Sequence, residues 1–259
     1  MPPARALLYA ATLGVLAFVA RAVLVAPPAL PTTIGVCVLY TGIFLSGVFF
    51  IRLRMFTDAV VGGPPDARGV SLTFDDGPHP VHTRKVLEVL AAAGVKATFF
   101  VIGKKAEKAP EIVREILASG HTVGLHSYGH ARLFAMKSPS SIKKDLVRGI
   151  AVLEEITGAK PALFRPPIGH TTPAIARVAD ELDLCVVGWS VSGIDGFAGA
   201  IPDLVEARVR AGLRHGAIVA LHDAPERGEH EPAGVKALPH ILKAIDALGL
   251  PVVPLEPWV

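Results

Sequence analysis

The chain has 259 residues, a formal net charge of +3 and an apolar composition, with a mean hydropathy of +0.48. Residues 1–57 carry only four charged side chains, all of them arginine, whereas residues 58–259 carry the other 22 basic and all 23 acidic ones. No run of lysine and arginine interleaved with aromatic residues occurs, so we expect no nucleic-acid partner. The two cysteines, Cys37 and Cys185, form no CxxC metal pattern and no disulfide framework, and we interpret both as packing residues.

The N-terminal region contains two apolar runs separated by prolines. The second run, residues 32–51, has 20 uncharged residues, enough for a helix to cross about 30 Å of hydrocarbon. The first run, residues 6–20, is shorter and is followed by Arg21, whose side chain can reach the membrane surface. Alternatively the first run is the apolar core of a signal peptide, and the second still anchors the chain. We predict a membrane-anchoring helical hairpin over residues 1–57.

Arginines at the outer ends of this hairpin bear on its orientation. The short connection PPALP between the two runs carries no charge. The positive-inside bias therefore places both termini in the cytoplasm. We expect an integral protein of a bacterial inner membrane, with membrane lipid among its partners.

After a predicted linker over residues 58–69, strand-type and helix-type segments alternate to the end of the chain. Expected strands cover 70–74, 97–102, 122–125, 184–189, 217–221 and 251–254, and expected helices cover 83–93, 110–118, 139–156, 173–182, 202–213 and 235–248. This alternation is typical of an α/β domain with a mainly parallel sheet, here residues 70–259. Polar clusters follow several of the strands, where parallel sheets carry their functional groups.

The stretch HSYGH places His126 and His130 four residues apart, so that one turn of chain can aim both imidazoles at a cation. Alone, this spacing is as typical of two unrelated polar residues. With a carboxylate from another strand end, it predicts a two-histidine, one-carboxylate metal site. The adjacent acids Asp75 and Asp76 then have different roles: one is a metal ligand and the other is a general base for metal-bound water. Without the histidines, Asp-Asp-Gly-Pro indicates only a turn.

Two further residues suit such a site. His222, in IVALHD, follows a buried strand and can protonate a leaving group, although a single histidine of this kind is more often a hydrogen-bonded core residue. Arg165 lies in the rigid segment RPPIG and can hold the base ionised and oriented; its alternative is a surface ion pair.

Together TFDDG, HSYGH, RPPIG and IVALHD, in this order, resemble the motifs of the NodB-homology polysaccharide deacetylases, carbohydrate esterase family 4. The resemblance covers nearly everything from residue 68 to the C-terminus. It implies a distorted (β/α) barrel that removes N-acetyl, sometimes O-acetyl, groups from sugar polymers, with a divalent metal that is usually zinc. The family's habit favours a domain outside the cell, against the charge pattern.

Carried over by position, the resemblance implies that Asp75 is the general base and that His222 is the general acid. Arg165 would orient Asp75. Backbone N–H groups around Ile168 would help to stabilise the oxyanion. The metal ligands would be Asp76, His126 and His130, and the substrate-binding residues Pro167, Ile168, Gly169 and Trp189.

One motif departs from the family. WSVSGIDG (189–196) has Ser192 and Gly196 where the family has Asp and Trp, but it keeps Asp195, which we expect to pair with Arg165. Ile168 stands where the family often has Tyr or Phe. Both changes indicate a different wall of the sugar groove.

Three functions remain open from the sequence. The leading one is a metal-dependent hydrolase that removes N-acetyl groups from amino sugars of a peptidoglycan-like or chitin-like polymer or oligomer. The second is deacylation of a lipid-linked sugar at the membrane surface. The third, a catalytically silent carbohydrate-binding protein, is disfavoured because such a protein has no need of the base, the acid and the metal ligands together.

Overall fold

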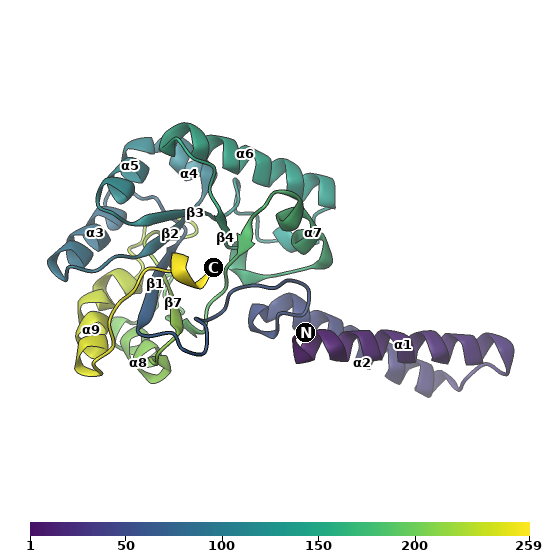
Figure 1. Cartoon of the computed structure of the whole chain (residues 1–259). Coiled ribbons are helices and arrows are strands. Elements are labelled where there is room, and N and C mark those ends of the chain that lie inside the picture. The colour runs from purple at the N-terminus through teal and green to yellow at the C-terminus, as the bar shows by residue number, and fades with distance from the viewer.

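The computed structural model describes all residues, 1–259, as an α/β barrel from which two long helices project (Figure 1). The seven strands are all parallel, in the order β5-β4-β3-β2-β1-β7-β6. They are β1 (Val70–Asp75), β2 (Thr98–Val101), β3 (Thr122–Leu125), β4 (Leu163–Phe164), β5 (Cys185–Val186), β6 (Val191–Ser192) and β7 (Ala217–His222). Because β5 and β6 do not pair, the barrel is open on that side. The fold expected from the sequence, a distorted (β/α) barrel behind a helical hairpin, is confirmed as an architecture.

Helices cover the outside of the sheet (Figure 1). They are α3 (His82–Ala92), α4 (Gly103–Lys108), α5 (Pro110–Ala118), α6 (Pro139–Thr157), α7 (Pro173–Glu181), α8 (Pro202–Gly212) and α9 (Ala233–Ala247). Their apolar stripes and the outward faces of the strands form one core cluster of 39 buried residues. Some expectations from the sequence differ. Neither α4 nor β6 was foreseen, the strand expected over 184–189 is only the short β5, and the strand expected over 251–254 is a single bridge between Val252 and Val70.

The central strands alternate between an apolar outer face and an inner face that carries function. In β1, Val70, Leu72 and Phe74 belong to the helix-facing core, so Ser71, Thr73 and Asp75 face the barrel interior. In β7 the same period turns His222 inward, and His222 lies opposite Asp75 in the register. A small apolar cluster fills the interior below these polar ends: Phe100, Leu163, Val187, Ile218 and Leu255.

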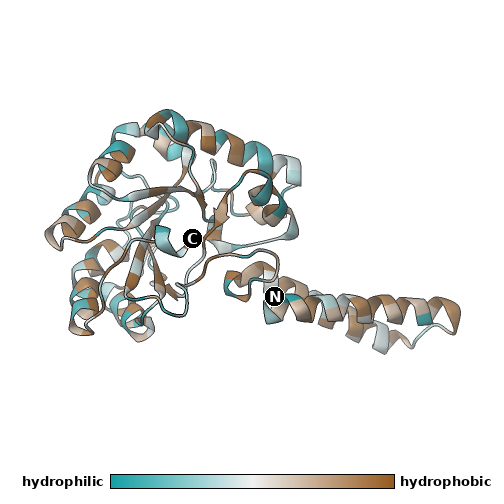
Figure 2. Ribbon diagram, in the orientation of Figure 1, coloured by the Kyte–Doolittle hydropathy of each residue, from teal (hydrophilic) through white to brown (hydrophobic).

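The N-terminal hairpin consists of α1 (Pro3–Leu24) and α2 (Leu30–Phe49), which pack side by side (Figure 1). Both are long and apolar enough to span a membrane, and almost none of their surface is buried. The hydropathy colouring shows a brown hairpin outside a barrel with teal helix surfaces (Figure 2). A core helix of a soluble protein would hide such a surface, so burial in the protein does not explain these helices.

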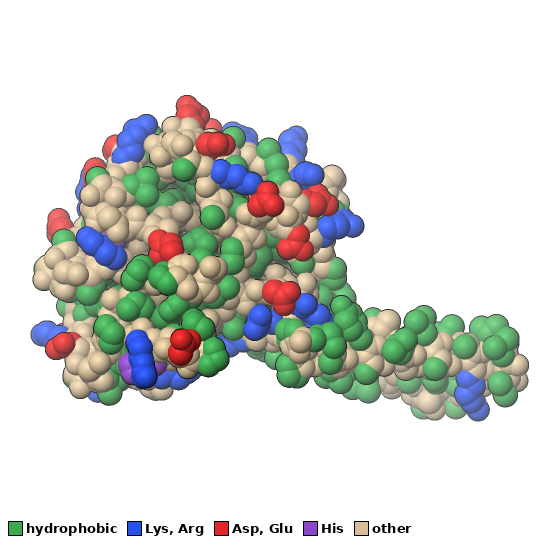
Figure 3. Space-filling model, in the orientation of Figure 1, with side chains coloured by type: hydrophobic (Ala, Val, Ile, Leu, Met, Phe, Trp, Pro, Cys, Tyr) green, Lys and Arg blue, Asp and Glu red, His purple; other side chains and the backbone are tan.

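Charged residues mark the junction between hairpin and barrel (Figure 3). Arg5, at the start of α1, reaches back to Asp58 at 3.0 Å and donates to the carbonyl of Met55 at 3.1 Å. The beginning of α1 and the end of α2 therefore lie together at the barrel, with the proline-rich connection at the far tip. If the hairpin crosses a membrane, the N-terminus and the barrel are on the same side.

The segment between α2 and β1 packs onto the barrel. We call residues 50–61 the neck. Ile51 and Ala59 belong to the main core, and Val60 accepts from Gly188 and donates to Val186, each at 2.8 Å, extending the open β5 side of the barrel. The predicted division at residue 57 thus falls within a segment that is buried against the predicted deacetylase domain.

Candidate metal and catalytic site

Asp76, His126 and His130 meet at the carboxyl ends of β1 and β3, and all three are buried. Oδ1 of Asp76 lies 3.5 Å from Nε2 of His126 and 3.2 Å from Nε2 of His130. One ligand atom from each residue lies within 4.8 Å of the others, close enough to hold one ion. Asp76, Ser127 and His130 have positive φ angles, which turn these side chains inward from the strand ends.

The hydrogen bonds of His126 prepare it as a ligand. Its Nδ1 lies 2.7 Å from the carbonyl oxygen of Arg165, so Nδ1 carries the proton and Nε2 presents its lone pair to Asp76. Burial, reinforced by the neighbouring His130, lowers the pKa of His126 to about 3. A neutral imidazole with a fixed tautomer is the form that binds a metal.

Two atoms of the cluster lack partners within the protein. Oδ1 of Asp76 and Nδ1 of His130 are buried and accept or donate no hydrogen bond. A buried carboxylate oxygen that faces two imidazole nitrogens and accepts no hydrogen bond is unfavourable unless a cation lies between them. Two imidazoles and one carboxylate are also a donor set that suits zinc, with coordination positions left over. The residues therefore fit a divalent cation.

Asp75 is fixed by a buried arginine. Nη1 of Arg165 donates to Oδ1 of Asp75 at 2.7 Å and to Oγ1 of Thr73 at 2.8 Å, and Nη2 donates to the carbonyl of Gly188 at 2.8 Å. Arg165 is fully buried against the ring of Phe100, and this burial lowers its pKa. The buried guanidinium pairs with the Asp75 carboxylate and holds it in one orientation.

His222 is paired with Asp195, the residue that the sequence analysis assigned to Arg165. Its Nδ1 lies 2.9 Å from Oδ1 of Asp195, and its backbone N–H donates to Oδ2 of Asp195 at 2.9 Å. The expected pairing of Asp195 with Arg165 is wrong, because Asp195 follows β6, which neighbours the strand of His222, whereas Arg165 follows β4 on the other side. Burial disfavours the charged imidazole, but the carboxylate of Asp195 outweighs it and raises the pKa of His222 to about 10.

The departure at Gly196 has a steric reason. A Cβ atom at this position would lie 2.9 Å from the ring of His222, so the imidazole packs directly on the backbone. An indole cannot occupy that space, and the loop after Asp195 instead presents Phe197 to solvent.

The site opens into a groove of about 510 Å³. The predicted residues Asp75, Asp76, His126, His130 and His222 line it together with Ile168, Gly169 and Trp189, while Pro167 is buried behind them. The sequence reasoning missed Thr73, which the period of β1 places beside Asp75, and it missed the lining residues Ile194, Phe197, Glu226 and His230.

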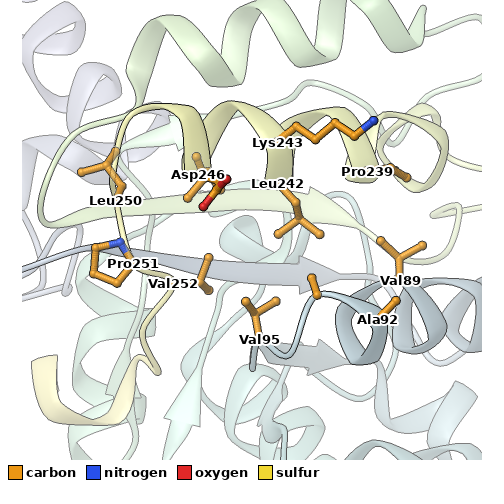
Figure 4. Close-up of a pocket in the computed structure, with 12 residues that line it drawn as sticks. Val89, Ala92, Val95, Pro239, Leu242, Lys243, Asp246, Leu250, Pro251 and Val252 are labelled. Carbon is orange, nitrogen blue, oxygen red and sulfur yellow. The ribbon is translucent and has the colours of Figure 1, made fainter.

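A second cavity, of about 650 Å³, lies between α3 and α9 (Figure 4). Its walls are mainly apolar side chains, with Lys243 and Asp246 on α9. It contains none of the predicted site residues.

The parallel half-barrel carries an Asp-His-His cluster flanked by two side-chain pairs, Asp75 with Arg165 and His222 with Asp195. This arrangement is typical of the active site of a metal-dependent hydrolase. Residues 62–187 match the family model described as polysaccharide deacetylase. A chitooligosaccharide deacetylase from Bradyrhizobium is 34% identical over 202 residues, which cover 75% of this chain and 92% of that protein. The chain belongs to the polysaccharide deacetylase family, and the resemblance expected from the motifs is confirmed.

Two further relatives agree with this assignment. A peptidoglycan-N-acetylglucosamine deacetylase from Bacillus cereus is 34% identical over 187 residues, 72% of this chain and 66% of that protein. The crystal structure of a peptidoglycan N-acetylglucosamine deacetylase superposes with a TM-score of 0.71 at 33% identity, covering 76% of this chain and 91% of the other. The expected class of enzyme, a polysaccharide deacetylase, is therefore confirmed.

Proposed function

We propose that this chain is a membrane-anchored hydrolase that removes N-acetyl groups from amino sugars of a polymer or oligomer, of the peptidoglycan or chitin type. The observation that carries the proposal is the placement of Asp75 and His222 opposite each other, each with its own buried partner, around the Asp76 cluster. The names of the relatives, which act on peptidoglycan or chito-oligosaccharides, support the substrate class.

In this mechanism the side chains divide the proton transfers. Asp75 accepts a proton from the attacking water while Arg165 holds the carboxylate in position. Nε2 of His222 donates a proton to the departing amine, and Nδ1–H of His222 donates to Asp195, which stabilises the imidazolium. Water and amide are thereby converted to acetate and amine.

Asp76, His126 and His130 would hold the cation, and zinc fits their donor set best. When bound, a divalent cation supplies Lewis-acid polarisation of the amide carbonyl and lowers the pKa of water. Backbone N–H groups beside Ile168, whose φ of 59° turns the chain at the groove, would stabilise the developing oxyanion.

The anchor is the other part of the proposal. The exposed apolar surface of α1 and α2 supports insertion of the hairpin in a bacterial inner membrane. The arginines at the barrel end support a cytoplasmic barrel. A reporter active only in the periplasm, fused to the C-terminus, tests this side: reporter activity would contradict it.

The test of the activity uses the full chain in detergent micelles with chito-oligosaccharides as substrate. We expect acetate release that stops after chelation and returns with Zn²⁺. Acetate release that survives complete chelation would contradict the metal-dependent mechanism, and its absence from chito-oligosaccharides, peptidoglycan and lipid-linked amino sugars alike would contradict the enzyme.

A further inference from the structure

The end of α2 contacts the loop that forms one wall of the groove. The backbone N–H of Thr171 donates to the carbonyl of Val48 at 3.0 Å, and its hydroxyl donates to the carbonyl of Gly47 at 3.0 Å. The rings of Phe49 and His170 meet edge to face, 5.0 Å apart. Ile168, which lines the groove, precedes His170 by only two residues, so the groove begins beside the last turn of an apolar helix.

Exposed apolar side chains continue from this helix end across the groove. Phe49 is 53% exposed and Ile168 is 46% exposed; Ile194 and Phe197, which line the same groove, are each 55% exposed. A soluble protein rarely leaves several large apolar side chains exposed around one groove unless it binds something apolar there.

Two of these residues adopt an unfavourable backbone conformation. Ile168 has a φ of 59° and Ile194 a φ of 53°, the left-handed region in which β-branched residues are outliers. Glycine or asparagine would relieve strain at both positions and would remove apolar surface from the groove. Strain and exposure at the same two side chains point to a role in binding.

The remaining rim of the groove is polar. Glu226 lies in the groove with Arg132 and Arg227, and it accepts two hydrogen bonds from Arg132, at 2.9 and 3.1 Å. The groove thus has one apolar side, continuous with the hairpin, and one charged side. A sugar polymer has similar surfaces in both directions, whereas an amphiphile has one apolar end and one polar end.

We propose that the N-acetylated amino sugar is presented on a membrane amphiphile, with the sugar at the catalytic residues and the apolar chain leaving along Ile168, Ile194 and Phe197 toward the end of α2. The inference rests on the proposed deacetylase function and on insertion of the hairpin. It narrows the substrate class to a lipid-linked amino sugar within reach of the membrane surface.

The test compares two substrates on the full chain reconstituted in phospholipid vesicles: chito-oligosaccharides carrying a dodecyl or a methyl group at the reducing end. We expect kcat/KM for the dodecyl glycoside to exceed that for the methyl glycoside at least tenfold, since burial of an alkyl chain of this size is worth about that much or more. In the double variant Ile194→Asn with Phe197→Ser this ratio should fall by about tenfold.

The matched control is Leu248→Asn, at a leucine with 54% exposure after α9, which should leave the ratio unchanged. The single variant Ile194→Asn should also unfold at a higher temperature than the parent chain, because asparagine tolerates the left-handed conformation. If the double variant lowers kcat/KM equally for both glycosides, their ratio stays the same. That result would show that Ile194 and Phe197 contact the sugar and not the alkyl chain, and it would overturn the proposal.

A binding measurement tests the amphiphile proposal independently of the deacetylase activity. With Trp258→Phe as background, the fluorescence of Trp189 in the groove reports binding of either glycoside. Equal affinity for the dodecyl and methyl glycosides overturns the amphiphile, whatever the activity. Tighter binding of the dodecyl glycoside without acetate release supports the binding surface and contradicts the proposed reaction.

Discussion

The two sides of the catalytic groove are built in opposite ways. Around Asp76 and His130, buried polar atoms lack partners, whereas Asp75 and His222 each have a buried charged partner within 2.9 Å. A set of lone pairs that no donor satisfies is incomplete without a cation. Carboxylate–arginine and imidazole–carboxylate pairs are complete, and they set ionisation and orientation before a substrate arrives. The difference separates metal binding from proton transfer, and variants on each side can test it.

The largest effect is expected from Asp76→Ala. The variant removes the only carboxylate of the cluster, so the full chain should lose its bound metal and its deacetylase activity should fall roughly a thousandfold or more. Metal content by mass spectrometry and acetate release measure the two losses. Asp246→Ala, at an exposed acid on α9, is the control and should retain both. Full metal occupancy in Asp76→Ala would contradict the assignment of this side.

Asp75→Asn should separate proton transfer from metal binding. It removes the base but no metal ligand, so kcat should fall roughly 10²- to 10⁴-fold while metal content stays at the level of the parent chain. The variant also leaves the buried Arg165 without its counter-charge, which should destabilise the fold by about 3 kcal/mol. Thermal unfolding with and without chelator measures this change apart from activity. Loss of metal in Asp75→Asn would show that Asp75 also binds the metal, so that the two acids do not have separate roles.

The motifs allowed the sequence to predict which residues gather at the site, because parallel strands bring their carboxyl ends to one edge of the sheet. Asp75, His126 and His222 lie where that rule places them. Which side chains form hydrogen-bonded pairs within the site could not be predicted in the same way. Asp195 was assigned to the wrong partner because the sequence does not reveal that β6 lies beside β7 at the open edge of the barrel.

The neck was also beyond sequence reasoning. The sequence assigned Ile51 and Met55 to the membrane hairpin and residues 58–69 to a linker, yet Ile51, Met55 and Ala59 are almost fully buried. Their burial depends on contacts that only the folded chain creates: Ile51 packs beside Gly188 after β5, and Met55 packs beside Gly47 in α2. The positive φ angles of Ile168 and Ile194 escaped prediction for a related reason: isoleucine disfavours that conformation, so only tertiary contacts can hold it there.

A smaller loss is expected from Asp195→Asn on the proton-transfer side. The asparagine keeps the size of the side chain but can no longer accept both hydrogen bonds of His222 as a charged carboxylate. We expect kcat to fall about 100-fold, with KM and metal content unchanged, because the general acid is misoriented in the step that it serves. A change confined to KM would instead assign Asp195 to substrate binding.

The smallest effect is expected where the hairpin meets the site, at Thr171→Val. The variant removes only the hydroxyl that donates to Gly47 at the end of α2, a hydrogen bond worth about 1 kcal/mol, so kcat should fall a few-fold and Thr171→Ser should restore it. Faster amide hydrogen exchange at Gly169 and Thr171 should accompany the loss, since the loop is then held by one hydrogen bond instead of two. Thr33→Val, which removes a hydroxyl near the tip of the hairpin, should change neither measurement. Unchanged exchange in Thr171→Val would mean that the hairpin does not position the groove, whereas faster exchange with lower kcat would make the hairpin a positioning element of the catalytic site.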